Sequence, residues 1–343
     1  MRQLRKILYP FSLLYGGILR LRNYLYNQQI LESTVYDFPV ICVGNLSMGG
    51  TGKSPMIEYL VRLLATHYRL GTLSRGYKRK TKGYLEVATA HTALEVGDEP
   101  LQFKRKFKPL LVAVCEDRRK GIEQMRKRQK PPEVILLDDA FQHRRVQPNL
   151  SILLSAYNDL YTQDCVLPAG NLREPKVGAR RAQLIVVTKC PVDLGKAERQ
   201  KIIRAIQPNP DQLVFFSSIT YADQVTNGKQ HIPLQVLQDS FTLVTGIAKP
   251  KPLVEFLKAK GFSVNHKQYQ DHHNFSRQEI ETLEAEPFII TTEKDFVRLS
   301  DYISPEKLFY LPIKMEFIAD AASFDQRIKK HVQAYACDRS RTS

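Results

Sequence analysis

The chain has 343 residues, of which 43% are hydrophobic and 25% charged, so it is long enough for one large or two medium folded domains. A formal net charge of +16 favours an acidic partner, which could be nucleic acid, an anionic membrane surface or a phosphorylated substrate. The five cysteines are odd in number and widely spread, with no C-x-x-C pair, which indicates reduced thiols in a cytoplasm rather than a disulfide framework.

The first element is an apolar run over residues 7–19 with arginine and lysine on both sides. As a helix it would reach roughly 20 Å, against about 30 Å for a bilayer core, so it should not span a membrane. Pro10 and Gly16-Gly17 interrupt the run, and no small-residue cleavage site follows, which argues against a signal peptide. We expect residues 1–35 to form an amphipathic helix at a membrane interface. The alternative is an N-terminal helix packed on its own domain.

The next stretch predicts a strand, a phosphate-binding loop and a helix. An apolar β-branched run from Val40 stops at Gly44, and apolar residues recur at helical spacing after Lys53 and Ser54. Glycines in the loop allow main-chain N–H groups to approach a triphosphate, and the helix N-terminus directs its free amides and dipole at the same anion. Lys53 would reach the β- and γ-phosphates, and Ser54 would ligate Mg²⁺.

One position departs from the strict G-x-x-x-x-G-K-S/T pattern, because Ser47 stands where glycine is usual. The alternative interpretation is an ordinary strand, turn and helix with chance glycines. We predict instead that a nucleotide is bound by Ser47, Met48, Gly49, Gly50, Thr51, Gly52, Lys53 and Ser54.

Apolar runs at 69–74, 110–114, 134–137, 150–154 and 184–187 alternate with helical patterns. This alternation predicts an α/β fold with a doubly wound parallel sheet and ligands at the carboxyl ends of its strands. The run at 134–137 ends in Asp138 and Asp139, which is what a Walker-B-like Mg²⁺ site needs beside the phosphates. Either aspartate could instead cap a turn. The acidic Gly97-Asp98-Glu99-Pro100 segment, taken alone, predicts a loop.

The second half predicts a smaller α/β domain. Asn227-Gly228 lies between two β-prone runs, a strong hairpin signal, and we expect residues 218–240 to form a two-stranded connector with Gly228 in the hinge. The predicted organisation is therefore a P-loop kinase domain at 36–217, the connector, a smaller domain at 241–330 and a frayed basic tail at 331–343.

Six sequence blocks, taken in order, resemble the tetraacyldisaccharide 4'-kinase family. They are VGNLSMGGTGKSP at 43–55, LSRGY at 73–77, VGDEP at 96–100, DDAFQHRR at 138–145, LPAGNLREP at 167–175 and TEKD at 292–295. The resemblance extends from about residue 8 to residue 312. Ala140 and Asn171, like Ser47, differ from the commonest family residues, which affects loop geometry more than chemistry.

The resemblance implies a P-loop kinase that uses ATP and Mg²⁺. Its acceptor would be the 4'-hydroxyl of an acylated disaccharide 1-phosphate, a lipid A precursor, at the cytoplasmic face of the inner membrane. A basic protein with a shallow hydrophobic anchor suits such an anionic glycolipid.

The resemblance also implies roles for individual residues. Asp98 corresponds to the carboxylate that accepts the sugar hydroxyl proton, and His272 to the histidine paired with it. Without the resemblance, His272 would be assigned to a polar surface loop. The remaining matches are Lys53 and Ser54 for phosphate and metal, Asp138 and Asp139 for the metal, Arg118 for the nucleotide, and Arg173 and Glu174 in a loop near the substrate.

Two other functional classes remain open from the sequence. A membrane-targeted P-loop ATPase or GTPase switch also carries GGTGKS and an amphipathic helix, although such proteins usually have lysine where Met48 stands. A nucleic-acid-binding protein would explain the charge. Basic residues are scattered, however, and no binding module is recognisable, so we expect no nucleic acid partner.

Overall fold

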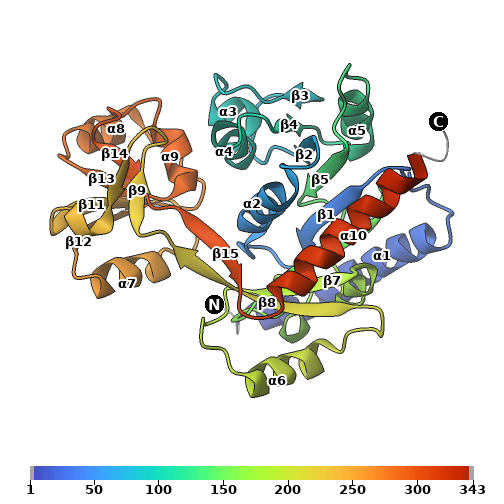
Figure 1. Ribbon diagram of the computed structural model, residues 1–343. Coiled ribbons are helices and arrows are strands. Elements are labelled where there is room, and N and C mark those ends of the chain that lie inside the picture. Colours follow the sequence, from blue (N-terminus) through green and yellow to red (C-terminus); the bar gives the residue numbers. More distant parts are fainter. Residues whose placement is uncertain (1–3, 340–343) are drawn as a thin grey trace.

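The computed structural model describes residues 4–339, which fold into two α/β units, each around its own sheet (Figure 1). The larger unit contains a nine-stranded sheet in the order β15-β8-β7-β6-β1-β5-β2-β4-β3. Strands from β8 to β4 in this order run parallel, and β15 and β3 are antiparallel edges. This confirms the predicted doubly wound parallel sheet.

The strands of this sheet are β1 (Val40–Asn45), β2 (Leu70–Ser74), β3 (Leu85–Glu86), β4 (Leu111–Val114), β5 (Val134–Asp138), β6 (Leu150–Ala156), β7 (Leu184–Thr188), β8 (Leu213–Tyr221) and β15 (Ile313–Phe317). The helices of this unit are α1 (Tyr9–Asn27), α2 (Lys53–Leu64), α3 (Ala93–Val96), α4 (Asp98–Lys106), α5 (Arg118–Arg126), α6 (Lys196–Ile206) and α10 (Ala321–Arg339). Short 3₁₀ turns lie at Leu4–Leu8, Tyr161–Gln163 and Lys176–Arg181.

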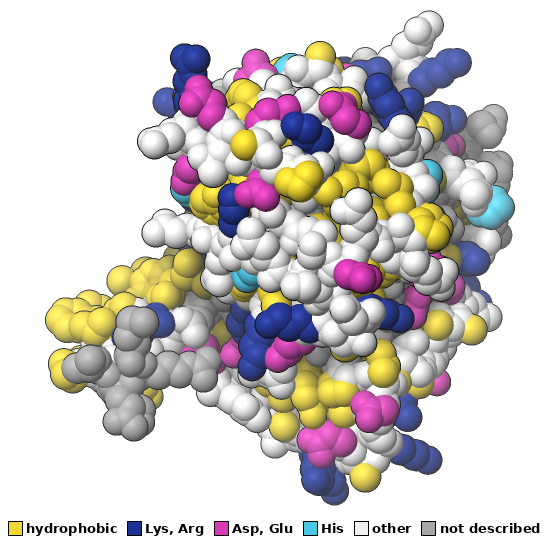
Figure 2. All heavy atoms as spheres, turned by 90° about the vertical axis from the view of Figure 1, so that its left-hand side faces the viewer, with side chains coloured by type: hydrophobic (Ala, Val, Ile, Leu, Met, Phe, Trp, Pro, Cys, Tyr) yellow, Lys and Arg dark blue, Asp and Glu magenta, His cyan; other side chains and the backbone are white. Residues whose placement is uncertain are grey.

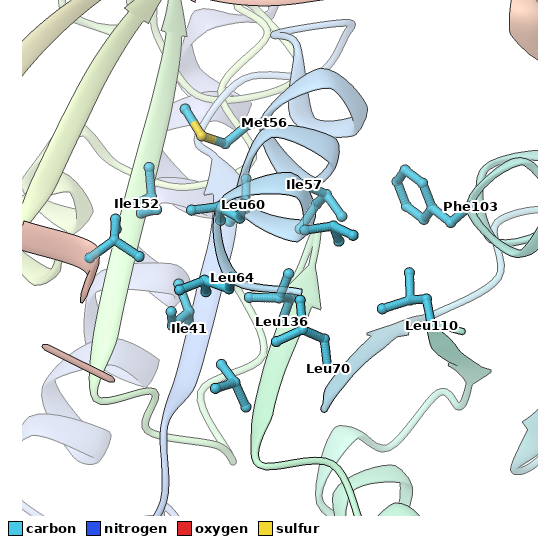
Figure 3. Packing of buried hydrophobic residues seen from close by; sticks show 14 of the residues in the cluster. Ile41, Met56, Ile57, Leu60, Leu64, Leu70, Phe103, Leu110, Leu136 and Ile152 are labelled. Atoms are coloured by element: carbon cyan, nitrogen blue, oxygen red, sulfur yellow. The ribbon is translucent and has the colours of Figure 1, made fainter. Parts of the chain in front are cut away.

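Both faces of the central strands are covered, as their continuous apolar sequences require. Along β1, Ile41 and Val43 belong to one hydrophobic cluster, while Val40 and Cys42 belong to another on the opposite face. The first cluster packs against α2, α4 and α10, and the second against α5 and α6. In Figure 3, Leu60 and Leu64 of α2 lie over β1, β5 and β6. This packing fixes the start of α2 at the carboxyl edge of the sheet.

The smaller unit contains a six-stranded sheet in the order β10-β9-β14-β13-β11-β12. Its strands are β9 (Gln224–Thr226), β10 (His231–Pro233), β11 (Ser240–Thr245), β12 (Ser263–Gln268), β13 (Ile289–Thr291) and β14 (Leu308–Tyr310). Its helices are α7 (Lys251–Ala259), α8 (Arg277–Glu284) and α9 (Glu293–Leu299), with a 3₁₀ turn at Leu234–Val236. A smaller α/β unit was predicted here, although β12 and α9 were not.

The predicted connector requires a correction. The Asn227-Gly228 hairpin forms, with Gly228 at a left-handed φ of 86°, but β9 and β10 are part of the six-stranded sheet. The two units are joined instead by β8 and β15, which pair antiparallel and lie between them (Figure 1). The hairpin lies in the small sheet because β9 pairs with β14 as well as with β10. Gly228 is therefore not in the hinge.

The C-terminal segment also differs from the prediction. Instead of a frayed tail after residue 330, α10 continues to Arg339 and returns to the large sheet. Phe324, Ile328 and Val332 are at most 1% exposed because they pack in the same cluster as α2. Residues 313–339 therefore belong to the larger unit. The last part of the predicted tail, residues 340–343, lies outside the described residues.

Helix α1 packs by one narrow face. Ser12, Gly16, Leu19 and Asn23, at helical spacing, are the buried positions. Most of its large apolar residues are exposed instead: Tyr9, Phe11, Leu13, Leu14, Ile18, Leu21 and Tyr24. Figure 2 shows hydrophobic side chains gathered on a projection at the left of that view, where this helix begins. Within residues 4–339, no helix is long and apolar enough to cross a bilayer.

Candidate active site

The phosphate loop connects β1 to α2 and is held by hydrogen bonds from the sheet. Gly49 and Gly52 have φ values of 115° and 87°, a left-handed region that side chains other than glycine rarely adopt. Asn45 Nδ2 donates to Thr51 Oγ1 over 2.8 Å, and Thr188 Oγ1 donates to the Thr51 carbonyl over 2.7 Å. The loop is therefore shaped before any ligand arrives, with the N-terminus of α2 at its end.

Ser47 has a local explanation. It forms an isolated antiparallel bridge with Leu172, and the neighbouring Met48 N–H donates to the Asn171 carbonyl over 2.7 Å. The backbone at Ser47 is not left-handed, so glycine is not required there. The loop at 167–175, one of the six family blocks, thus forms one wall of the phosphate loop.

Lys53 and Arg173 share one carboxylate. Lys53 Nζ lies 3.6 Å from Asp139 Oδ1, and the Arg173 guanidinium makes two hydrogen bonds to the same carboxylate, of 2.7 and 3.0 Å. Burial opposes ionisation of Asp139, but the Arg173 hydrogen bonds and the Lys53 charge prevail and lower its pKa to about 2. The structure thus brings Arg173 to the nucleotide loop, where its charge adds to that of Lys53.

Asp138 is in a different electrostatic state from its neighbour. It ends β5, is 1% exposed, and its Oδ1 atom has no hydrogen-bond partner within the described residues. Burial, with the nearby Glu99 carboxylate, raises the pKa of Asp138 far above its ordinary value. A divalent cation would relieve both effects. The residues therefore fit a Mg²⁺ ion that takes only one or two protein carboxylates beside phosphate oxygens.

No group of three metal-ligating His, Cys, Asp or Glu side chains is assembled in the part of the chain that the structure describes. Ser54, predicted as a metal ligand, donates its hydroxyl to Glu99 Oε1 over 3.0 Å. Glu99 also lies 3.5 Å from Lys294 Nζ. This links the end of the phosphate loop to α4 and, through Lys294, to α9 of the smaller unit.

Asp98 and His272 meet across the two units. Asp98 is the first residue of α4, where the helix dipole favours a negative charge, and its Oδ2 atom lies 2.7 Å from His272 Nδ1. The backbone of His272 is left-handed, with a φ of 58°, and its N–H donates to the Gly246 carbonyl. Non-glycine residues held in this region often mark functional sites.

The contacts of His272 assign its tautomer. Lys294 Nζ lies 3.0 Å from Nε2, and an ammonium group can only donate, so Nε2 accepts. Nδ1 then carries the proton and donates it to Asp98. His272 and Arg298 hydrogen bond to Asp98 and outweigh its burial, which holds the pKa of Asp98 well below its ordinary range. Asp98 is thus an ionised acceptor at the boundary of the two units.

Two predicted residues have mainly structural contacts. The Arg118 guanidinium is buried and donates to the main-chain carbonyls of Cys115, Glu116 and Asp139. Glu174 is 0% exposed and accepts hydrogen bonds from Arg181 and Asn23, which attaches α1 to the loop at 167–175. In this structure Glu174 is an anchor for α1 and its carboxylate is not open to a substrate.

Sequence reasoning missed three residues that the structure places in the site: Glu99, Lys294 and Arg298. Glu99 and Lys294 were within the family blocks VGDEP and TEKD but received no role. Arg298 lies one helical turn after the TEKD block. The helical spacing from Lys294 to Arg298 is the signal that could have found it.

Comparison with known proteins gives a consistent result over nearly the whole chain. Residues 4–333 match the family described as LpxK, tetraacyldisaccharide-1-P 4'-kinase. A tetraacyldisaccharide 4'-kinase from Flavobacterium johnsoniae is 46% identical, covering 97% of this chain and 98% of its own length. One from Bacteroides thetaiotaomicron is 39% identical, with coverages of 99% and 96%.

This chain is also similar to a solved structure, in its fold as well as in its sequence. The crystal structure of LpxK from Aquifex aeolicus in complex with ATP superimposes with a TM-score of 0.77 at 32% identity, covering 95% of this chain and 99% of that one. Both the family match and these relatives cover the phosphate loop and the smaller unit together. The chain therefore belongs to the tetraacyldisaccharide 4'-kinase family.

Proposed function

We propose that this chain transfers the γ-phosphoryl group of ATP to the 4'-hydroxyl of an acylated glucosamine disaccharide 1-phosphate. The observation that carries the proposal is the Asp98–His272 pair, which is linked to the phosphate loop through Lys294, Glu99 and Ser54. A proton acceptor for the alcohol and a binding loop for the phosphate donor thus belong to one network. A nucleotide switch needs only the loop.

The phosphate loop supplies donor binding. Its main-chain amides and the N-terminus of α2 would hold the triphosphate, and Lys53 with Arg173 would offset its negative charge. Bound Mg²⁺ would neutralise further charge beside the phosphates. Asp138, Asp139 and Ser54 would hold it, and Asp138 fits this role best because one of its oxygens is buried with no hydrogen-bond partner among residues 4–339.

The acceptor side of the reaction follows from the state of Asp98. A sugar hydroxyl is a poor nucleophile at neutral pH, so a positioned carboxylate must take its proton as the new P–O bond forms. His272 donates to Asp98 and itself accepts a hydrogen bond from Lys294, so the imidazole is held in place and orients the carboxylate. Closure of the two units around this contact would exclude water and limit hydrolysis.

Helix α1 would hold the enzyme at its lipid substrate. Exposed apolar side chains such as Phe11 and Leu14, 62% and 67% exposed, can enter the boundary between head groups and acyl chains. Each basic residue near the membrane surface would add about 1 kcal/mol to the free energy of binding to anionic lipid. We therefore infer a peripheral position on the cytoplasmic face of the inner membrane, with an anionic surface as partner.

The test is a product analysis with the full chain, ATP, Mg²⁺ and the acylated disaccharide 1-phosphate. The proposal predicts a disaccharide product heavier by one phosphate, attached at the 4' position, and little ATP hydrolysis without the disaccharide. ATP turnover that depends on lipid alone, with no phosphorylated disaccharide, would support a nucleotide switch and reject the kinase.

A further inference from the structure

Arg298 on α9 makes contacts that no role yet explains. Its side chain is 6% exposed and bridges two carboxylates: Nη1 lies 3.0 Å from Asp295 Oδ1, and Nη2 contacts Oδ2 of Asp98. A buried guanidinium between two buried carboxylates is costly to assemble unless every group is paired. Arg298 comes from the smaller unit and Asp98 from the larger one, so this contact crosses the boundary between them.

Asp295 fixes the other end of Arg298. It is 0% exposed, and its Oδ2 atom accepts hydrogen bonds from the Gly246 N–H over 2.8 Å and from Thr292 Oγ1 over 2.7 Å. Because Oδ1 accepts a hydrogen bond from Arg298, both oxygens of Asp295 have partners within the smaller unit. The guanidinium is therefore presented to Asp98 in one orientation.

The two groups that hydrogen bond to the Asp98 carboxylate contact the same oxygen. His272 Nδ1 and Arg298 Nη2 both contact Oδ2, and they lie 3.1 Å from each other because they share that acceptor. No hydrogen bond reaches Asp98 Oδ1 from any residue in the 4–339 range that the structure describes. The carboxylate is thus held firmly by one oxygen while the other remains available.

We propose that Arg298 is a positioning residue that, together with His272, occupies Oδ2 of Asp98 and reserves Oδ1 as the atom that accepts the proton of the attacking hydroxyl. This rests on the proposed function, in which Asp98 is the base. The alcohol oxygen forms its bond to the γ-phosphorus, the bond from that phosphorus to the departing ADP breaks, and the alcohol proton passes to Oδ1.

Arg298 also sets the charge of the base. Asp98 is largely buried, and burial alone would favour its protonated, inactive form. His272 and Arg298, which donate to its carboxylate, favour the charged form. The ionisable groups around it come from several elements. They are Glu99 on α4, Lys294, Asp295 and Arg298 on α9, and Asp271 and His272 after β12, with Tyr77 packed against the His272 ring.

The test compares variants of the full chain by the pH dependence of kcat with ATP, Mg²⁺ and the disaccharide. Arg298→Met should lower kcat by about 10²-fold, the scale for a misplaced reacting group, and should move the acid limb to higher pH. The acid limb moves in this direction because Asp98 loses a cation that favours its ionised form, so the carboxylate takes up a proton at a higher pH. Arg298→Lys should restore the acid limb but only part of kcat, since an ammonium group cannot fork between Asp98 and Asp295.

The matched control is Arg105→Met. Arg105 on α4 donates to Ser300 Oγ over 2.9 Å and to Asp301 Oδ1 over 3.0 Å, a guanidinium contact between α4 and the residues that follow α9, and it does not touch Asp98. This variant should keep the wild-type acid limb and lose no more than a few-fold in kcat. Thermal melts report whether each variant is folded.

A wild-type acid limb in Arg298→Met, equal to that of Arg105→Met, would overturn the positioning role while leaving the kinase proposal intact. If Arg298→Met does not fold, Arg298→Lys decides: a lowered kcat with an unchanged acid limb supports the proposal, and a wild-type kcat rejects it. Failure of the wild-type chain to phosphorylate the disaccharide would instead reject the proposed function itself.

Discussion

Nδ1 of His272 lies 2.7 Å from Oδ2 of Asp98, although the two residues are 174 positions apart and belong to different units. The contact exists only while the smaller unit lies against α4. Chemistry that depends on this pair therefore depends on the arrangement of the two units, and a change at their boundary should alter turnover more than nucleotide binding.

Replacing either member of this pair should lower turnover strongly. Asp98→Asn removes the proton acceptor, and His272→Ala removes the group that orients it, so each should reduce kcat by about 10²–10⁴-fold. The double variant should lose little more than the worse single variant, because the two residues act as one unit. Full multiplication of the two losses in steady-state kinetics would show that they act independently.

Lys53→Ala should abolish phosphoryl transfer without unfolding the chain. Asp139 keeps its two hydrogen bonds to Arg173 when the lysine is absent, so the melting temperature should change little. Lys201→Ala is the control, since Lys201 is an exposed lysine on α6 that pairs with Glu198 on the same helix. Normal transfer by Lys53→Ala in a phosphate-transfer assay would remove the lysine from the site.

Glu293 should make stability fall as pH rises toward neutral. Burial and the neighbouring Glu58 outweigh the charge of Lys106 and raise the pKa of Glu293 from 4.5 to about 7. A raised pKa in the folded state means that stability is greatest below the unfolded value of 4.5 and is lost as pH rises through 7. Glu293→Gln cannot ionise and should lack this loss, which is about 3 kcal/mol.

Thermal melts of the two proteins between pH 4.5 and 8 measure the difference. Glu255→Gln serves as the control, because Glu255 is exposed on α7 and pairs with Lys251 one turn away. Its stability curve should run parallel to that of the wild type. If the curve of Glu293→Gln is also parallel, Glu293 does not titrate in this range.

Changing the exposed face of α1 should release the protein from membranes and leave its fold intact. Phe11, Leu14 and Ile18 are 58–67% exposed, so replacing all three by serine removes no core contact. Co-sedimentation with vesicles containing anionic lipid should fall at least tenfold. A matched triple change to serine at Leu213, Val236 and Tyr302, exposed hydrophobic residues elsewhere, should sediment like the wild type. Equal sedimentation of both triple variants would reject α1 as the membrane contact.

Local signals in the sequence predicted the phosphate-binding unit well. The β-branched run of β1, the glycines and the helical spacing of α2 are all contained in residues 40–64, and their structure agrees with the expectation. The Asp138-Asp139 pair could be found equally well from the sequence, because it stands where the apolar run of β5 ends. Such features are visible because strand, turn and helix each have a short repeat.

Features that depend on distant pairing were missed or misplaced. Strand β15 pairs with β8 almost a hundred residues earlier, and neither segment carries a local signal for its partner. Residues 313–330 were therefore assigned to the smaller unit, and residues 331–339 to a tail. Helix α9 was missed because Glu293, Asp295 and Arg298 are buried charges that hide its apolar face. Buried charges are rare unless paired, and the partners here include the other unit and Gly246 as well as residues of α9 itself.

The central claim is that a triphosphate held by the phosphate loop faces the Asp98–His272 pair. A crystal structure of the full chain with Mg²⁺ and a non-hydrolysable ATP analogue tests it most directly. The account predicts the γ-phosphate against Lys53, with Asp98 Oδ1 directed toward the space in front of it. An empty loop, or a nucleotide bound elsewhere with Asp98 turned away, would contradict the account.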